Sequence, residues 1–151
     1  MAQNRPAAKS REVSPYELFE HTADLGLRVT ARDLGLLFRD AAEGLFAMIV
    51  ERIPKGDPAE RLEFRVEGRR LDWLLFDWLN ELLYVFESRR LVLSLFEVEV
   101  DEDGLSATAR AYPFDPRRQR ATHEVKAITY HRLRVERVDE GGWIAEVIVD
   151  I

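Results

Sequence analysis

The residues best suited to chemistry are carboxylates near the two ends of the chain. Glu20 and Asp24 flank a short polar segment, and Asp150 comes directly before Ile151, whose terminal carboxylate is a further negative group. Oxygen donors of this kind, completed by backbone carbonyls and water, are the ligands that Ca²⁺ and Mg²⁺ prefer. If the last strand pairs beside the N-terminal segment, a cation would neutralise carboxylates that otherwise repel one another. The alternative is that Asp24 caps its own turn and the C-terminus frays.

Most other signatures of catalysis are missing from the chain. It has no glycine-rich phosphate loop, no G-x-S-x-G elbow and no H-E-x-x-H helix. The three histidines, His21, His123 and His131, are not spaced as zinc ligands. His131 alternates with apolar residues, which predicts an interior or edge position. A metal-dependent hydrolase with His21 as general base is a less favoured alternative, because no nucleophile–base pair accompanies it.

The composition argues for a soluble, cytoplasmic protein. The chain has 151 residues, 28 acidic and 22 basic side chains, a net charge of −6 and no cysteine. The acidic balance lacks the basic footprint of a nucleic-acid binder, so we expect no strong direct contact with nucleic acid. The absence of cysteine excludes disulfides and suits a reducing compartment. No apolar run approaches the roughly 20 residues of a spanning helix, so we expect no membrane association.

Hydrophobic spacing predicts the elements that must position these carboxylates. We expect a flexible arm over residues 1–15 and one domain over residues 16–151. Alternating apolar residues predict strands at 16–20, 25–30, 62–66, 92–100, 105–112, 124–138 and 143–151, and helical spacing predicts helices at 34–50 and 71–88. Four successive strands after the helices are typical of the α+β class. The prediction is a two-layer fold, a mixed and mostly antiparallel sheet with two main helices packed on one face.

Two further features have more than one interpretation. Arg117, Arg118 and Arg120 crowd one loop, which fits a phosphate or acidic-partner contact or, as the favoured interpretation, a solvated loop. Trp73 and Tyr84 stand on the otherwise polar stripe of the second helix. They suit a partner surface or, as the favoured interpretation, cover for a sheet edge or a neighbouring loop.

Five sequence blocks together resemble the archease family. They are EHTAD at 20–24, AAEGLF at 41–46, DWLNELLY at 77–84, EVKAITYH at 124–131 and VDI at 149–151. The blocks stand in the family's order, and the resemblance spans about residues 16–151. It implies a non-enzymatic protein that assists an RtcB-type RNA ligase. Such a ligase joins 2′,3′-cyclic-phosphate or 3′-phosphate RNA ends to 5′-hydroxyl ends in tRNA splicing and RNA repair.

The resemblance also implies a mechanism and a set of site residues. The family promotes guanylylation and multiple turnover of the ligase, and an older proposal makes it a chaperone or modulator of tRNA methylation. By resemblance, Asp24, Asp150 and the terminal carboxylate of Ile151 hold a divalent cation, with calcium the expected metal. His21 is a neighbour in the same motif, and Lys126 belongs to a block tied to ligase activation.

Overall fold

The computed structural model of the chain describes residues 15–21, 24–52, 60–139 and 141–151. The arm expected over residues 1–15 lies, apart from Pro15, outside this part. In chain order the elements are β1 (Tyr16–His21), β2 (Asp24–Ala31), α1 (Leu34–Ile49), β3 (Glu60–Glu67), α2 (Leu71–Arg89), β4 (Leu91–Asp101), β5 (Gly104–Pro113), β6 (Ala127–Ile128), β7 (Arg134–Arg137) and β8 (Trp143–Asp150).

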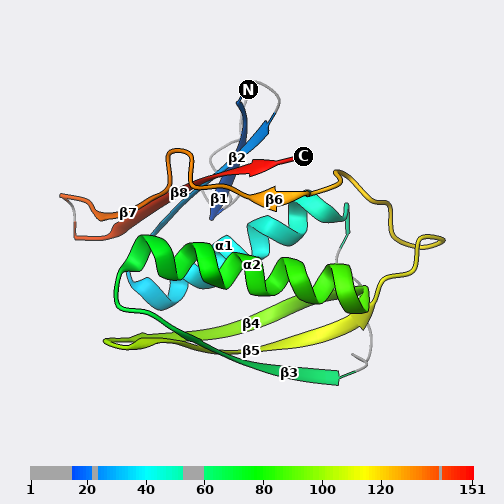
Figure 1. Ribbon diagram of the computed structural model, residues 1–151, viewed down its shortest axis with the longest axis horizontal. Coiled ribbons are helices and arrows are strands. Elements are labelled where there is room, and N and C mark those ends of the chain that lie inside the picture. The colour runs from blue at the N-terminus through cyan, green and yellow to red at the C-terminus, as the bar shows by residue number, and fades with distance from the viewer. Residues whose placement is uncertain (1–14, 22–23, 53–59, 140) are drawn as a thin grey trace, which may run out of the picture.

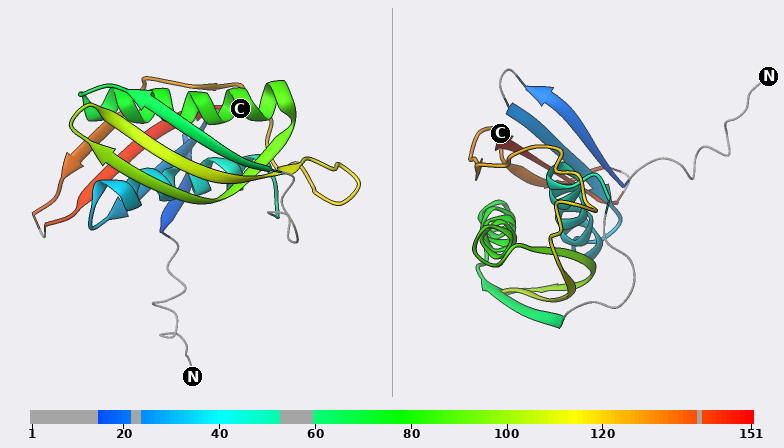
Figure 2. Two further views of the ribbon diagram at one scale, coloured as in Figure 1. Left: turned by 90° about the horizontal axis from the view of Figure 1, so that it is seen from below. Right: turned by 90° about the vertical axis from the view of Figure 1, so that its right-hand side faces the viewer.

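The strands form two sheets, with the two helices between them. One sheet has the order β1-β2-β8-β6, with β7 also paired to β8, and the other has the order β3-β5-β4. Every pairing between these strands is antiparallel. Figure 1 shows the larger sheet above the helices and the smaller sheet below them, and the right-hand view of Figure 2 shows the same arrangement end-on.

Helix α1 begins and ends where its sequence allows. Asp33, a residue type favoured at the N-cap, accepts a hydrogen bond from the backbone N–H of Leu36 at 2.9 Å. At the other end the N–H of Val50 still bonds to the carbonyl of Phe46 at 2.9 Å, although Val50 itself is extended. Gly44 lies against β1 and β2, where a Cβ would come within 2.5 Å of the Leu27 side chain. The glycine therefore permits the close approach of α1 to the larger sheet.

The core lies where the helices meet both sheets. Trp78 of α2 is completely buried, and its indole N–H donates to the carbonyl of Phe38 in α1 at 3.0 Å. The Trp78 ring also makes edge contacts with Phe64 of β3 and Phe96 of β4. A large buried aromatic ring with its one polar atom satisfied is a strongly stabilising arrangement. This residue fixes the two helices to each other and to the smaller sheet.

The predicted α+β class, the mostly antiparallel strands and the two helices are confirmed. The prediction of a single sheet is wrong, because the strands form two sheets. Helix α1 contacts β4 on one side and β1 and β2 on the other. Its buried residues surround most of its circumference and include Asp40, Ala42, Phe46 and Met48. A helix that is buried on nearly all sides needs cover from more than one layer. The strands therefore divide into two sheets, and the helices fill the space between them.

The prediction of one long strand over residues 124–138 is also wrong. The chain forms only the short strands β6 and β7, joined by a turn in which Arg132 has a left-handed φ of 58°. The Thr129 hydroxyl donates to the Ile148 carbonyl at 2.7 Å and accepts from the His131 N–H at 3.2 Å. A side chain that bonds the backbone in this way competes with a regular ladder. His131 consequently lies exposed in the turn and not in the interior.

No helix in the described ranges is long and apolar enough to cross a membrane.

Candidate functional site

The ends of four strands form one cross-strand row at the edge of the larger sheet. His21 of β1 pairs with Asp24 of β2, and Asp24 pairs with Asp150 of β8. On the other side of β8, Asp150 pairs with Ala127 of β6. Figure 1 shows the C-terminal end of β8 reaching the start of β6. The expected meeting of the N-terminal motif with the end of the chain is therefore present in the fold, although residues 22 and 23 lie outside the described part.

Asp24 and Asp150 lie on the outer face of this sheet, away from the helices. Leu25 and Val149, which follow and precede them in their strands, are buried in the core. Because successive side chains alternate between faces, the two aspartates lie on the opposite face. Directly paired residues share a face, and their Cβ atoms are about 4.5–5.5 Å apart. Both aspartates are partly exposed, and within the described residues neither makes an ion pair.

The donor set fits a hard divalent cation, with further oxygens needed to complete it. Two like charges directly opposite each other destabilise a sheet, and a bound cation removes that cost. No group of three Asp, Glu or His side chains placed to hold a metal ion occurs in the described part of the chain. The remaining ligands of such a site would be backbone carbonyls, water or the terminal carboxylate. Glu20 does not join the pair, because it lies opposite Leu25 and so faces the other way.

Lys126 reaches the same row through its backbone. Its N–H donates to the Asp150 carbonyl at 2.8 Å. Lys126 also lines a cavity of about 730 Å³ together with Asp77 and Tyr84 of α2. The structure therefore places Lys126 between the aspartate pair and the outer side of α2. The side chain of His21, the other predicted neighbour of the site, lies outside the described part of the chain.

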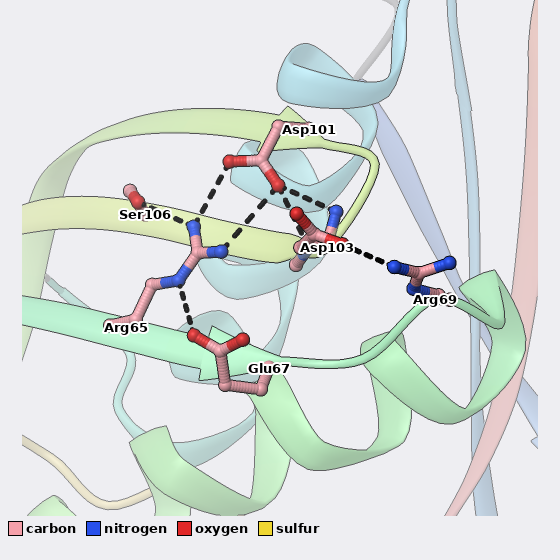
Figure 3. A network of polar contacts seen from close by, with 7 residues as sticks. Arg65, Glu67, Arg69, Asp101, Asp103 and Ser106 are labelled. Carbon is pink, nitrogen blue, oxygen red and sulfur yellow. Dashed lines mark hydrogen bonds and ion pairs between the residues drawn. The ribbon is translucent and has the colours of Figure 1, made fainter.

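Other clusters of carboxylates are neutralised by the protein itself. Figure 3 shows Arg65 at the centre of one, beside the β4–β5 hairpin. Its guanidinium lies 3.1 Å from Asp101 and 2.8 Å from Glu67, and it donates to the Ser106 hydroxyl at 2.9 Å. The hydrogen bond from Arg65, with those from backbone N–H groups, holds the pKa of Asp101 below its usual range. This cluster already has its positive charge and needs no cation.

Glu146 of β8 is a buried carboxylate that sequence analysis missed. It is 2% exposed and lies 2.8 Å from Arg28, with Arg132 at 3.4 Å and Arg134 at 3.7 Å. The hydrogen bond from Arg28 to Glu146 raises the pKa of the arginine above its ordinary value. The register pairs Arg28 with Glu146. Only that long-range pairing reveals the ion pair, because neither residue is unusual within its own strand.

Asp40 of α1 is a second buried carboxylate that sequence analysis missed. It is 4% exposed and interrupts the apolar side of the helix, with Arg39 at 2.9 Å. Burial raises the pKa of Asp40 and of its neighbour Glu43, and it also raises that of Tyr16. A guanidinium again accompanies the buried aspartate, so this region resembles the Glu146 site and not the Asp24–Asp150 pair.

The two ambiguous surface features have different surroundings. The side chains of Arg117, Arg118 and Arg120 are exposed. Trp73 makes edge contacts with Phe76 and with Tyr130 of the turn after β6, and it is still 39% exposed. Tyr84 is 65% exposed and makes no ring contact within the described residues.

Comparison with known proteins gives consistent matches over nearly the whole chain. The Archease protein family (MTH1598/TM1083) matches residues 16–151. A relative named protein archease from Methanopyrus kandleri is 41% identical over 91% of this chain and 99% of its own length. The Pyrococcus abyssi protein of the same name is 39% identical over 90% of this chain and 98% of its own length.

Solved structures agree with the sequence matches. The solution structure of protein 1598 from Methanobacterium thermoautotrophicum is 30% identical, with a TM-score of 0.74 over 92% of this chain and 100% of that one. A Thermotoga maritima crystal structure, described as an archease and possible chaperone, supports the fold with 22% identity and a TM-score of 0.58 over 88% of this chain and 94% of that one.

Proposed function

The chain belongs to the archease family, and from that premise we propose that it is a non-catalytic activator of an RtcB-type RNA ligase. In this proposal it promotes guanylylation and multiple turnover of the ligase in the cytoplasm. It does so with a divalent cation, calcium as the expected metal, at the end of the larger sheet. The processes served are tRNA splicing and RNA repair.

The observation that supports the proposal best is the Asp24–Asp150 pair. Two carboxylates lie opposite each other on an exposed sheet face, and the described residues provide no basic side chain in an ion pair with either. We assign the cation to these two side chains and to the terminal carboxylate of Ile151. When bound, the cation supplies positive charge that can neutralise phosphate oxygens.

Lys126, beside this row, and His21, within it, would orient the site toward the partner. The Lys126 N–H holds the Asp150 carbonyl at 2.8 Å, which fixes the end of β8 beside β6. The Lys126 ammonium group is available to an anionic group of the ligase or its nucleotide. His21 completes the row on the side of β1. All of these groups lie along one edge of the larger sheet, an arrangement that suits insertion into another enzyme's active site.

A guanylylation assay of the cognate ligase tests the proposal. The rate of ligase–GMP formation from labelled GTP is measured without this protein, with the wild type, and with Asp24→Asn or Asp150→Asn. Asp101→Asn is the matched control, because it removes an exposed carboxylate that the protein neutralises itself. We expect stimulation by the wild type and by the control, and little or none by the two site variants. Equal stimulation by all four proteins would contradict the cation mechanism.

Two alternatives predict different outcomes. The Thermotoga maritima relative is described as a possible chaperone, and a chaperone or modulator of a tRNA methyltransferase would bind and stabilise that enzyme without affecting the ligase. A metal-dependent hydrolase would turn over nucleotide or phosphoester as a purified protein. The activator proposal predicts neither result.

A further inference from the structure

The exposed stripe of α2 carries acidic side chains that the protein does not neutralise. Asp77, Glu81 and Glu87 are all exposed, and none makes an ion pair or a side-chain hydrogen bond within the described residues. Asp77 and Glu81 are four residues apart, so they are neighbours on the helix surface, and like charges at this spacing destabilise a helix. By contrast, the acidic side chains of the Arg65 cluster in Figure 3 are held by guanidinium groups.

Large aromatic side chains occupy the same side of the molecule. Five large hydrophobic side chains are exposed in the described part of the chain, and three of them are Trp73, Tyr84 and Tyr130. Trp73 and Tyr84 belong to α2, and the Tyr130 ring lies 4.8 Å from that of Trp73. Tyr130 is 59% exposed even though it also stacks on Phe76 at 4.3 Å. Exposed Trp and Tyr side chains are the residue types most enriched among energetically dominant contacts at protein interfaces.

A groove follows this stripe. Its volume is about 730 Å³, and α2 lines it with Asp77, Asn80, Glu81, Tyr84 and Glu87. Residues of β3 line it as well, and so do Ala127 of β6 and Lys126, which directly precedes β6. In Figure 1 the outer side of α2 faces the viewer between the two sheets.

The charge of the groove is negative once internal ion pairs are removed. Arg65 and Glu67 line it, but they neutralise each other at 2.8 Å. The unpaired groups are then the three carboxylates of α2 against the single ammonium group of Lys126. A phosphate backbone would be repelled by such a surface, whereas lysine and arginine side chains would be attracted to it.

We propose that the outer stripe of α2, from Trp73 to Glu87, docks a basic segment of the partner protein. The stripe spans about 21 Å, from 14 steps of 1.5 Å each, which matches about six or seven residues of extended chain. Lysine or arginine side chains of that segment pair with Asp77, Glu81 and Glu87, and apolar side chains pack on Tyr84 and on the Trp73–Tyr130 pair. This inference rests on the proposed function, because the partner is taken to be the RtcB-type ligase.

A matched pair of variants tests the docking surface. Asp77→Asn, Glu81→Gln and Glu87→Gln are combined in one protein, and Glu97→Gln, Glu99→Gln and Glu102→Gln in the control. Residues of the control set are also exposed and without ion pairs in the described part of the chain, but they lie on β4 and its hairpin. Both variants raise the net charge of −6 by the same three units. Circular dichroism and thermal unfolding establish that each variant is folded.

The probe is the purified cognate ligase, and the readout is its affinity by biolayer interferometry at low and high salt. We expect the α2 variant to bind about tenfold or more weakly than the wild type and to lose most of the salt dependence. The β4 variant should bind as the wild type does. Wild-type affinity of the α2 variant would overturn this inference alone. Failure of the wild type to bind the ligase at all would overturn the proposed function and this inference with it.

A second measurement identifies the segment. Overlapping peptides of about 12 residues from the ligase sequence are tested for binding to the wild type and to a Tyr84→Ala variant. We expect capture of a peptide rich in lysine or arginine, with weaker capture by Tyr84→Ala. Capture of acidic peptides only, or equal capture by both proteins, would contradict the assignment.

Discussion

Strand β8 carries two carboxylates on one face, four residues apart, in opposite surroundings. Glu146 is buried and has Arg28 at 2.8 Å, with Arg132 and Arg134 within 3.7 Å. Asp150 is partly exposed, and its cross-strand neighbour is another aspartate, Asp24.

We interpret Glu146 as a structural carboxylate and Asp150 as a carboxylate of the proposed cation site. A buried charge is tolerated where the protein supplies its partner, as at Glu146. At Asp24 and Asp150 the described residues provide no basic partner, and in our proposal a cation from outside the chain supplies the neutralising charge. The same reasoning distinguishes the neutralised Arg65–Asp101 cluster from the unpaired acidic residues of α2.

The largest expected effect is on cation-linked stability. Calcium added to EDTA-treated wild type should raise the free energy of unfolding by about 2.7 kcal/mol at a concentration of 100 times Kd, because it binds only the folded state. The double variant Asp24→Asn/Asp150→Asn should show no such increase. Thermal unfolding with and without calcium measures it. If calcium still stabilised the double variant, the cation would not bind at Asp24 and Asp150, and the proposed difference between Asp150 and Glu146 would be contradicted.

The next largest effect on stability is expected at Glu146, the carboxylate that the protein's own arginines neutralise. Glu146→Ala should lower the free energy of unfolding by about 1–3 kcal/mol, because it removes the buried partner of arginines that remain partly desolvated. Glu17→Ala removes the other, exposed partner of Arg28 and should change stability by less than about 0.5 kcal/mol. Urea unfolding at neutral pH gives both values. Equal losses for the two variants would show that burial does not decide the role of these carboxylates.

A small gain in stability is expected when one aspartate of the Asp24–Asp150 pair is neutralised. Without a cation, Asp24→Asn removes a like-charge repulsion across β2 and β8, so it should raise the free energy of unfolding by about 0.2–1 kcal/mol. The measurement is urea unfolding in EDTA. A loss of stability would mean that Asp24 has a structural partner.

The smallest effect is a pH-dependent one at the Arg65 cluster. The pKa of Asp101 is lowered in the folded state by the hydrogen bond from Arg65, so its contribution to stability is present above the unfolded pKa of about 3.9 and is lost as the pH falls through the folded value. Asp101→Asn should therefore unfold at slightly lower urea concentration than the wild type near neutral pH. The two midpoints should converge in acid. A difference that grows in acid would contradict this cause.

Much of the fold was predictable from local spacing, but the choice of strand partners was not. Alternation located the strands and the β4–β5 hairpin, whose Asp101 and Gly104 are paired. Division into two sheets depends on contacts between distant segments, which no local period encodes. The break after β6 was equally hidden, because it depends on hydrogen bonds from Thr129 to Ile148 and from His131 to Thr129.

Part of the candidate site was also predictable from the sequence. Residue type and the expected pairing of the last strand brought Asp24 and Asp150 together, and the register bears out that pairing. That the pair holds a cation remains a prediction. Glu20 lies on the opposite face of the sheet from Asp24, because a shift of one residue in register moves a side chain to the other face. Glu146 and Asp40 escaped notice because their burial arises from tertiary packing.

Calorimetric titration of calcium into EDTA-treated protein shows whether Asp24 and Asp150 hold the cation. The wild type, Asp24→Asn/Asp150→Asn and the control Asp101→Asn are titrated under the same conditions. We expect one calcium site per chain in the wild type and in the control, and weaker binding by on the order of 100-fold or more in the double variant. Unchanged binding by the double variant, or its loss in Asp101→Asn alone, would contradict the assignment of the site to the end of the larger sheet.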